Sequence, residues 1–222
     1  MKLLQDNIDK IVLHQLKNYW LEIDEDVIIK AVPQALQALD NCFSGLPIKR
    51  FFDGNESLFS PYVSIHWMLF LYRLSHLLYQ KGNTQAADQV YYLNKVMHAN
   101  DWFYAIELPT HFLCEHPVGS VLGRADYGDY FFVYQGTTVG GNRTKGILSY
   151  PRIGSNVILF ANATVLGDTT IGNNVIVSAE TYLKNEQIPN NCIVFGRSPN
   201  ITIKQKTELE IKEYTNHIWG WY

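Results

Sequence analysis

A six-residue repeat runs through the second half of the chain and limits the folds open to it. Between residues 153 and 188, a series of small or β-branched side chains and a series of aliphatic side chains each recur every six positions. The first series is Val157, Ala163, Thr169, Val175 and Thr181, and the second is Leu159, Val165, Ile171, Val177 and Leu183. Turn-forming residues such as Gly172-Asn173-Asn174 separate successive pairs.

This period suits neither an α-helix nor a meander of β-hairpins. It predicts a short strand with two inward side chains, then a tight corner, then the same unit again. One such strand cannot bury its apolar face alone, so stacked coils must supply the core. The alternative is a β-sandwich, whose strands recur irregularly at about 8 to 12 residues. Ten positions in register favour a parallel β-helix over residues 101–203.

The first half of the chain has a different period. Apolar residues recur there at three- and four-residue steps, which predicts helices. The expected helices cover about residues 8–19, 27–39, 62–80 and 84–98. We therefore expect an α+β chain with an α-helical domain over residues 1–100, followed by the β-helix.

The last segment, residues 204–222, is expected to be a C-terminal tail. It is charged at first and ends in the aromatic sequence His217-Ile218-Trp219-Gly220-Trp221-Tyr222. We expect a helix whose aromatic end packs on a neighbouring subunit.

Charge and cysteine content narrow the partners. The net charge of −3 gives no basic surface for nucleic acid. Cys42, Cys114 and Cys192 are far apart, which argues against disulfides and zinc and favours a reducing, cytoplasmic setting without a metal. The most apolar run, residues 67–72, is interrupted by Arg73 and is too short to span a membrane. The first seven residues acquire charges too early for a signal peptide.

Three segments of the repeat region resemble the serine acetyltransferase family. They are Glu115–Gly123, Tyr134–Gly141 and Pro151–Gly154. The family pattern has an acid followed by His, then Q-x-x-T-hydrophobic-G-G, then an excursion ending in H-P-[KR]-I. The resemblance covers about residues 70–200, and it implies a left-handed β-helix with three hexapeptides per coil, a helical N-terminal domain and acetyl-CoA as donor.

The resemblance implies that His116 is the general base, which removes the proton of an acceptor hydroxyl as it attacks the thioester. Imidazole suits this task because it titrates near neutral pH. A histidine in a surface turn is the alternative. The base needs an orienting acid, for which Glu107 is the first candidate and Asp101 the second. Glu115 matches an acidic position of the family that mainly contacts the amino group of the acceptor.

The resemblance also implies a donor site along the coils. Ala161 and Ala179 are 18 residues apart, so they should stack at one corner and leave the backbone open to an extended pantetheine arm. Gly141 matches another backbone contact, and Gly196 belongs to a closing turn. Arg197 could face the phosphates of the donor. Each of these assignments has an alternative: sharp corners of a β-helix require small residues in any case, and the arginine could simply be solvated.

The acceptor side departs from the family. The loop over residues 142–150 breaks the repeat and ends in Ser149-Tyr150, where the family has Arg-His. Ser149 and Tyr150 are therefore the candidate acceptor contacts. A serine hydroxyl does not replace a bidentate guanidinium, so the carboxylate clamp is missing unless Arg143, Lys145 or Arg152 substitutes for it.

Three functions remain open. The first is acetyl transfer from acetyl-CoA to the hydroxyl of a small polar acceptor, with serine as the leading candidate. The second is O- or N-acetylation of a sugar or nucleotide sugar for surface polysaccharide. It is favoured by nearby aromatic residues, namely Tyr127, Tyr130, Phe131, Phe132 and Tyr134. The third is a non-catalytic binding module. The resemblance implies a homotrimer or a dimer of trimers.

Overall fold

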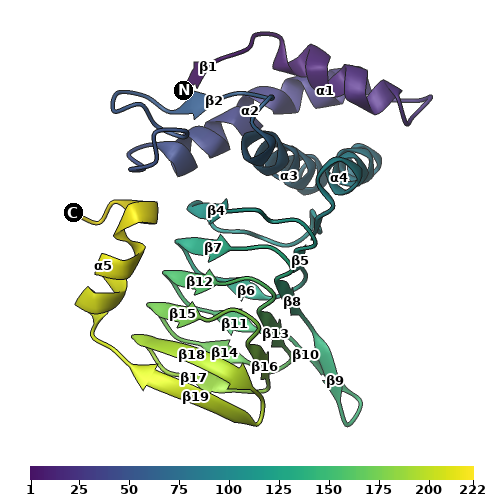
Figure 1. The fold of residues 1–222 in the computed structure, drawn as a ribbon. Coiled ribbons are helices and arrows are strands. Elements are labelled where there is room, and N and C mark those ends of the chain that lie inside the picture. The colour runs from purple at the N-terminus through teal and green to yellow at the C-terminus, as the bar shows by residue number, and fades with distance from the viewer. The chain divides into compact units, whose positions relative to one another are not determined.

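All 222 residues are described by the computed structural model, and they form two compact units, residues 1–105 and 106–222. The first unit contains four helices: α1 (Ile8–Lys17), α2 (Glu25–Phe43), α3 (Ser64–Gln80) and α4 (Thr84–His98) (Figure 1). The short strands β1 (Lys2–Leu3) and β2 (Leu58–Phe59) pair in parallel, and β3 (Asp101–Trp102) follows α4. The four helices expected from the apolar spacing are confirmed, with ends that differ by a few residues.

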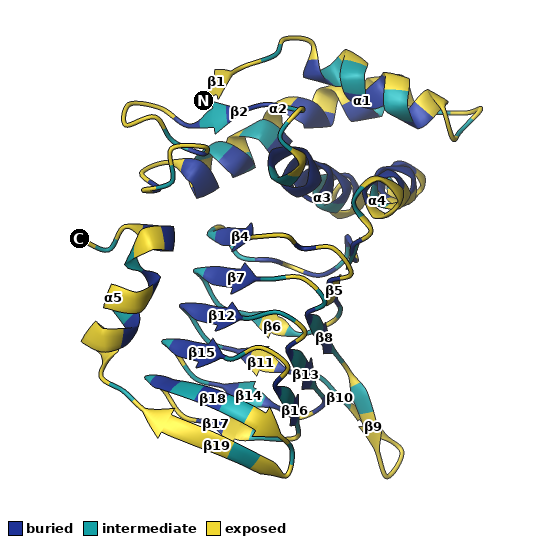
Figure 2. Ribbon diagram, viewed as in Figure 1, coloured by how far each residue is buried: buried dark blue, intermediate teal, exposed yellow.

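Helix α3 is the centre of this unit. It packs against α2 and α4, and it is buried along most of its length (Figure 2). Its nearly continuous apolar sequence explains this place, since a helix that is apolar all round must be covered all round. None of the helices combines the length and the apolar character that crossing a bilayer requires.

His66 lies inside this core, near the start of α3. Its ring is 5.2 Å from that of Phe43 and 5.0 Å from that of Phe51, measured between centroids. The backbone N–H of Ser60 donates to its Nδ1 atom at 3.2 Å. Burial, together with the nearby positive charge of Arg50, lowers the pKa of His66 to about 4. The imidazole is therefore neutral at physiological pH.

The second unit is a parallel β-helix whose strands form three faces, here named A, B and C (Figure 1). Face A consists of β4 (Phe112–Cys114), β7 (Phe131–Val133), β12 (Val157–Leu159), β15 (Val175–Val177) and β18 (Cys192–Arg197). Face B consists of β5 (Val121–Leu122), β8 (Thr138–Gly140), β13 (Thr164–Leu166) and β16 (Tyr182–Lys184). Face C consists of β6 (Asp126–Tyr127), β11 (Arg152–Ile153), β14 (Thr170–Ile171) and β17 (Gln187–Ile188).

Each face is in register from coil to coil. Val157 pairs with Val175 on face A, and Arg152 pairs with Thr170 on face C, so one coil takes 18 residues in both cases. The ten repeat positions all point into the coil, and none of them is more than 2% exposed. The six-residue period therefore identified the inner core correctly.

The three corners of the coil are named by the faces that they join: edge AB, edge BC and edge CA. Sharp corners require backbone with positive φ, which Asn and Gly adopt more readily than other residues. Edge CA uses Asn156, Asn174 and Asn191 at φ of 53°, 56° and 56°. Their side chains also form a ladder, in which Asn156 donates to Asn174 at 3.0 Å and Asn174 donates to Asn191 at 2.9 Å.

After the last coil the chain reverses. Strand β19 (Asn200–Gln205) pairs antiparallel with β18, and α5 (Glu208–Trp219) follows. Helix α5 begins with a capping box in which the Thr207 hydroxyl accepts the N–H of Glu210, and the carboxylate of Glu210 accepts the N–H of Thr207.

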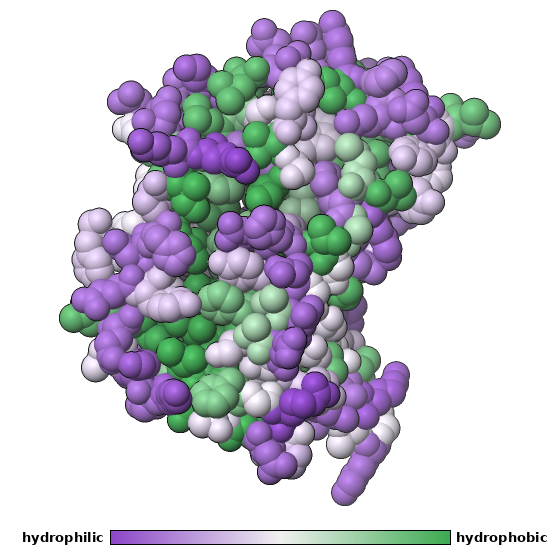
Figure 3. Space-filling view, viewed as in Figure 1, coloured by the Kyte–Doolittle hydropathy of each residue, from purple (hydrophilic) through white to green (hydrophobic).

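Helix α5 lies along face A (Figure 1). The outward side chains of that face are apolar, among them Phe132, Ile158, Ile176 and Ile193. Trp219 contacts the ring of Phe132 at 6.2 Å, and Ile211 and Tyr214 line a groove together with Ile176 and Ile193. Hydrophobic surface is visible in this seam (Figure 3). The expected tail helix is confirmed, but its expected packing on a neighbouring subunit is wrong, because the tail covers its own β-helix.

Candidate active site

His116 stands on edge AB, directly after β4. Its φ is 49°, the left-handed conformation that Gly136, Asn162 and Glu180 adopt on the same edge in later coils. The sharp corner turns the side chain outward, and it is 79% exposed. Neither ring nitrogen forms a hydrogen bond within the chain. The corner therefore presents a free imidazole to whatever binds along this edge.

Glu115 is the nearest acid to this imidazole. Its Oε1 atom lies 4.0 Å from Nε2 of His116, beyond hydrogen-bonding distance. The hydroxyl of Tyr134 lies beside Glu115, and burial together with this carboxylate raises the pKa of Tyr134 to about 12. Tyr134 in turn stacks on Phe160 at 4.9 Å between centroids. Glu115 is thus held next to a neutral phenol on the same edge as His116.

The two candidates for the orienting acid lie elsewhere. Glu107 is exposed in the segment before β4, and its side chain makes no hydrogen bond. Asp101 belongs to the helical unit, where it forms an ion pair with Lys95 at 2.6 Å and accepts a hydrogen bond from the hydroxyl of Tyr91. Within the β-helix unit, Glu107 does not contact His116.

The candidate donor residues fall into two groups. Ala161 and Ala179 are on edge AB in adjacent coils, and the N–H of Glu180 donates to the carbonyl of Ala161 at 2.8 Å. Both alanines are in later coils than His116, and their side chains are small. Gly196 and Arg197 lie instead in the β18–β19 hairpin, where a side chain at Gly196 would approach the carbonyl oxygen of Asn200 to 2.8 Å. The guanidinium of Arg197 lies 4.9 Å from the ring centroid of Tyr182.

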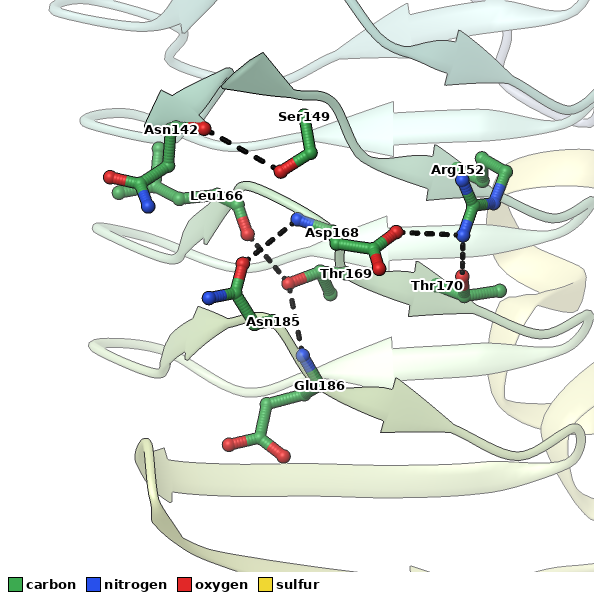
Figure 4. A network of polar contacts seen from close by, with 9 residues as sticks. All are labelled: Asn142, Ser149, Arg152, Leu166, Asp168, Thr169, Thr170, Asn185 and Glu186. Carbon is green, nitrogen blue, oxygen red and sulfur yellow. Dashed lines mark hydrogen bonds and ion pairs between the residues drawn. The ribbon is translucent and has the colours of Figure 1, made fainter. Parts of the chain in front are cut away.

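The candidate acceptor residues are on edge BC. The chain projects there as an antiparallel hairpin of β9 (Asn142–Thr144) and β10 (Ile147–Ser149). The hydroxyl of Ser149 donates to the carbonyl of Asn142 at 3.5 Å (Figure 4). The ring of Tyr150 lies against Gly141, where an added Cβ atom would come within 2.8 Å of its Cε1 atom. Gly141 therefore makes room for Tyr150.

Of the three cations that could replace the missing carboxylate clamp, the two arginines already have partners within the chain. Arg152 forms an ion pair with Asp168 at 2.9 Å and donates to Thr170 at 3.0 Å (Figure 4). Arg143 donates to the carbonyl of Gly146 within the hairpin at 3.1 Å. Lys145 is exposed at the hairpin tip and lines a pocket of about 370 Å³ with Ser149. None of these three contacts Tyr150.

Two pairs of interacting side chains were not predicted from the sequence. On edge BC, the guanidinium of Arg124 donates to the hydroxyl of Tyr150 at 3.2 Å. On edge CA, Nδ1 of His111 lies 2.8 Å from Oδ2 of Asp129, and the His111 ring stacks on Tyr130 at 4.4 Å. The second pair could have been found from the coil length, since its members are 18 residues apart. No group of three or more potential metal ligands occurs in the structure.

The structure thus gathers His116, Glu115, Ala161 and Ala179 on one edge of the coil. Gly141, Ser149 and Tyr150 lie on a second edge, at the other end of the strands of face B. A single chain does not bring the two sets together.

The comparisons agree with the repeat. The family model described as bacterial transferase hexapeptide (six repeats) matches residues 150–185. Serine acetyltransferase from Synechococcus elongatus is 30% identical over 129 residues, which are 58% of this chain and 52% of that protein. Serine acetyltransferase from Staphylococcus xylosus is 28% identical over 147 residues, 66% of this chain and 67% of that protein. The chain spans about half the length of the Synechococcus elongatus relative.

Solved structures match more of the chain. Serine acetyltransferase from Brucella abortus strain S19 aligns with a TM-score of 0.68 at 21% identity, over 91% of this chain and 86% of that chain. A serine acetyltransferase in complex with cysteine aligns with a TM-score of 0.72 at 17% identity, over 97% and 86%. These structures confirm the expected fold, helices followed by a left-handed parallel β-helix. The family model and the two relatives confirm the resemblance from which it was expected.

Proposed function

We propose that this protein is an acyltransferase that moves the acetyl group of acetyl-CoA to a hydroxyl of a small polar acceptor, with serine as the first candidate. The observation that carries the proposal is the unpartnered imidazole of His116 on edge AB, in line with the small residues Ala161 and Ala179. Serine acetyltransferases among the relatives, and a structural neighbour from Brucella abortus in complex with coenzyme A, support it.

His116 acts as the general base. It takes the proton of the acceptor hydroxyl while the hydroxyl oxygen forms a bond to the carbonyl carbon of the thioester. The carbon–sulfur bond then breaks, and the proton on His116 passes to the departing thiolate. No covalent bond to the protein forms. Glu115 stabilises the protonated imidazole or the amino group of the acceptor, and Glu107 is the candidate for an orienting acid.

The donor supplies an activated acetyl group on a long, flexible arm. Edge AB suits such an arm because Ala161 and Ala179 leave backbone amides within reach. Gly141, Gly196 and Arg197 remain the other proposed donor contacts, the last through the phosphates. Ser149, Tyr150 and Glu115 are the proposed acceptor contacts.

We infer that the site is completed by a second copy of the chain. His116 and Glu115 are on edge AB, whereas Ser149 and Tyr150 are on edge BC, so one chain does not bring the base to these two acceptor contacts. A threefold ring places edge AB of each copy beside edge BC of the next, which closes the assembly as a homotrimer. The helical unit could join two trimers. Sedimentation equilibrium tests this, and a monomer with full activity would contradict it.

The structure weakens the arguments for the sugar acetyltransferase. Of the aromatic residues that favoured it, Phe131 is buried in the core. Phe132 lies under Trp219, and Tyr130 is stacked on His111. These rings are therefore not free to bind a sugar. We propose that the reaction takes place in the cytoplasm, where the three buried cysteines, which form no disulfide, would remain reduced.

The decisive assay follows thiol release from acetyl-CoA with serine, homoserine, hexoses and nucleotide sugars as acceptors. We expect turnover with serine or homoserine. Turnover with a nucleotide sugar alone would identify the second function. If no acceptor supports turnover and calorimetry finds no binding of acetyl-CoA, the protein is a binding module and the proposal is wrong.

A further inference from the structure

Arg124 is the one arginine of edge BC that binds neither an acid nor a backbone carbonyl. It follows β5, and its exposed side chain reaches Tyr150, the residue that follows the hairpin. Its Nη1 atom donates to Oη of Tyr150 at 3.2 Å, and its Cζ atom lies 5.2 Å from the ring centroid. The ring of Tyr150 also lies against Gly141, where any side chain would meet it. The guanidinium is therefore held in place by a neutral partner.

The other arginines of this edge are occupied. Arg152 is paired with Asp168 and is also in register with Asp126 on the neighbouring strand. Arg143 is bound to the carbonyl of Gly146 in the hairpin. Arg124 keeps its full positive charge because a phenol hydroxyl does not neutralise it. Of its five N–H groups only one is used by Tyr150, so a planar pair of donors remains free.

We propose that Arg124, positioned by Tyr150, binds an anionic group of the acceptor. This inference rests on the proposed function, in which Tyr150 belongs to the acceptor side. A guanidinium grips a carboxylate or a phosphate through two parallel hydrogen bonds. Arg124 thereby places a positive charge beside Tyr150 on edge BC, where Ser149 carries none. The shared chemistry is an oxyanion, either the carboxylate of an amino acid or the phosphate of a nucleotide sugar.

Steady-state kinetics with paired acceptors tests the assignment. Serine is compared with serinamide, and a nucleoside diphosphate hexose with the free hexose, so that each pair differs in the anion. Charge-assisted hydrogen bonds predict that Arg124→Gln raises the KM for the anionic acceptor by about 10- to 100-fold. The kcat value should change little. Arg124→Gln should acetylate serinamide or the free hexose as efficiently as the unmodified protein does. Arg124→Lys should lie between the two.

Arg143→Gln is the matched comparison, because it removes a guanidinium from the same edge. Its KM for serine should stay within about twofold of the unmodified value. The inference is wrong if Arg124→Gln weakens neutral and anionic acceptors equally, if it has no effect, or if Arg143→Gln has the larger effect.

Donor binding separates this inference from the proposed function. Calorimetry with coenzyme A should give the same Kd for Arg124→Gln and the unmodified protein. If the unmodified protein acetylates nothing, the proposed function fails. Binding of serine and of a nucleoside diphosphate hexose is then measured directly, and equal affinities with and without the Arg124 guanidinium would overturn the anion site as well.

Discussion

Asp129 receives two contacts from His111, the residue one coil before it: the His111 backbone N–H donates to Oδ1 at 2.8 Å, and the imidazole Nδ1 lies 2.8 Å from Oδ2. Burial would raise the pKa of Asp129, but these contacts outweigh it and hold the pKa below its ordinary value. The His111 ring stacks on Tyr130, whose ring centroid lies 5.4 Å from that of Trp219, the last residue of α5. The pair therefore ties the first coil to the end of α5.

A carboxyl group with a lowered folded-state pKa stabilises the fold at pH values above its unfolded pKa and loses that effect as the pH falls through the folded value. Asp129→Asn should therefore lower the free energy of unfolding at pH 7. The difference from the unmodified protein should shrink once the pH drops below about 3.9, the ordinary Asp value. Urea unfolding at several pH values measures this. Glu213→Gln, an exposed change on α5, should show no such trend.

Replacing His116 tests the base without disturbing the corner. Asparagine tolerates positive φ, so His116→Asn keeps the backbone at this position while removing the imidazole. We expect kcat to fall by about 10²- to 10⁴-fold, the usual contribution of a general base. The Kd of coenzyme A should be nearly unchanged. An unchanged kcat would remove His116 from its role, and His217→Asn, at an exposed histidine of α5, serves as the control.

His66 should make the helical unit acid-sensitive. Its pKa is lowered from 6.5 to about 4, so the neutral form is favoured on folding, and its contribution is present above pH 6.5 and is lost as the pH falls toward 4. The loss amounts to at most about 3 kcal/mol. In His66→Asn the amide oxygen can still accept the N–H of Ser60. Unfolding free energies of this variant should vary less between pH 7 and pH 4, whereas His14→Gln should leave the slope unchanged.

The contact between α5 and face A depends on Trp219, which is 5% exposed. Trp219→Ala should cost about 3–5 kcal/mol, as for other large-to-small changes of buried aromatic residues. Hydrogen exchange should accelerate in α5 and in the outward positions of face A. Tyr222→Ala removes an aromatic ring that is 73% exposed and should have little effect. Equal exchange rates in the two variants would contradict the role of this contact.

The asparagine ladder on edge CA can be separated into its two parts. Asn174→Gly keeps the positive φ but loses both ladder hydrogen bonds, and should cost about 1–2 kcal/mol. Asn174→Ala also strains the corner, which adds about 1–2 kcal/mol. Urea unfolding should therefore rank the alanine variant below the glycine variant. The opposite order would mean that the conformation of the corner contributes nothing.

The coil was predictable because its ten inward positions obey one steric rule, and each must be apolar or small to fit inside. His116 was found through its motif, and its corner geometry is explained by the same coil. The packing of α5 was missed although Phe132, Ile158, Ile176 and Ile193 make face A apolar on its outer side as well. An apolar outer surface must be covered by another element, but the spacing of its residues does not say whether that element belongs to the same chain.

The acceptor side was harder to predict for a different reason. Arg124 and Tyr150 are 26 residues apart, and the hairpin between them breaks the 18-residue register that relates other neighbours. Their contact follows from how the hairpin returns to the coil and from the space left at Gly141. No periodic pattern in the sequence predicts this contact.

A coil of this kind has no natural end, because the last strand of each face offers the same hydrogen-bonding groups as every strand before it. Strand β19 runs back along β18 from the pair Cys192–Gln205 to the pair Arg197–Asn200 and occupies those groups on face A. Lys204 is exposed on β19 and places a positive charge on this strand. A second chain that approached this end would meet a reversed strand and positive charge in place of a template. The hairpin thus protects a repetitive protein from growing end to end into fibres.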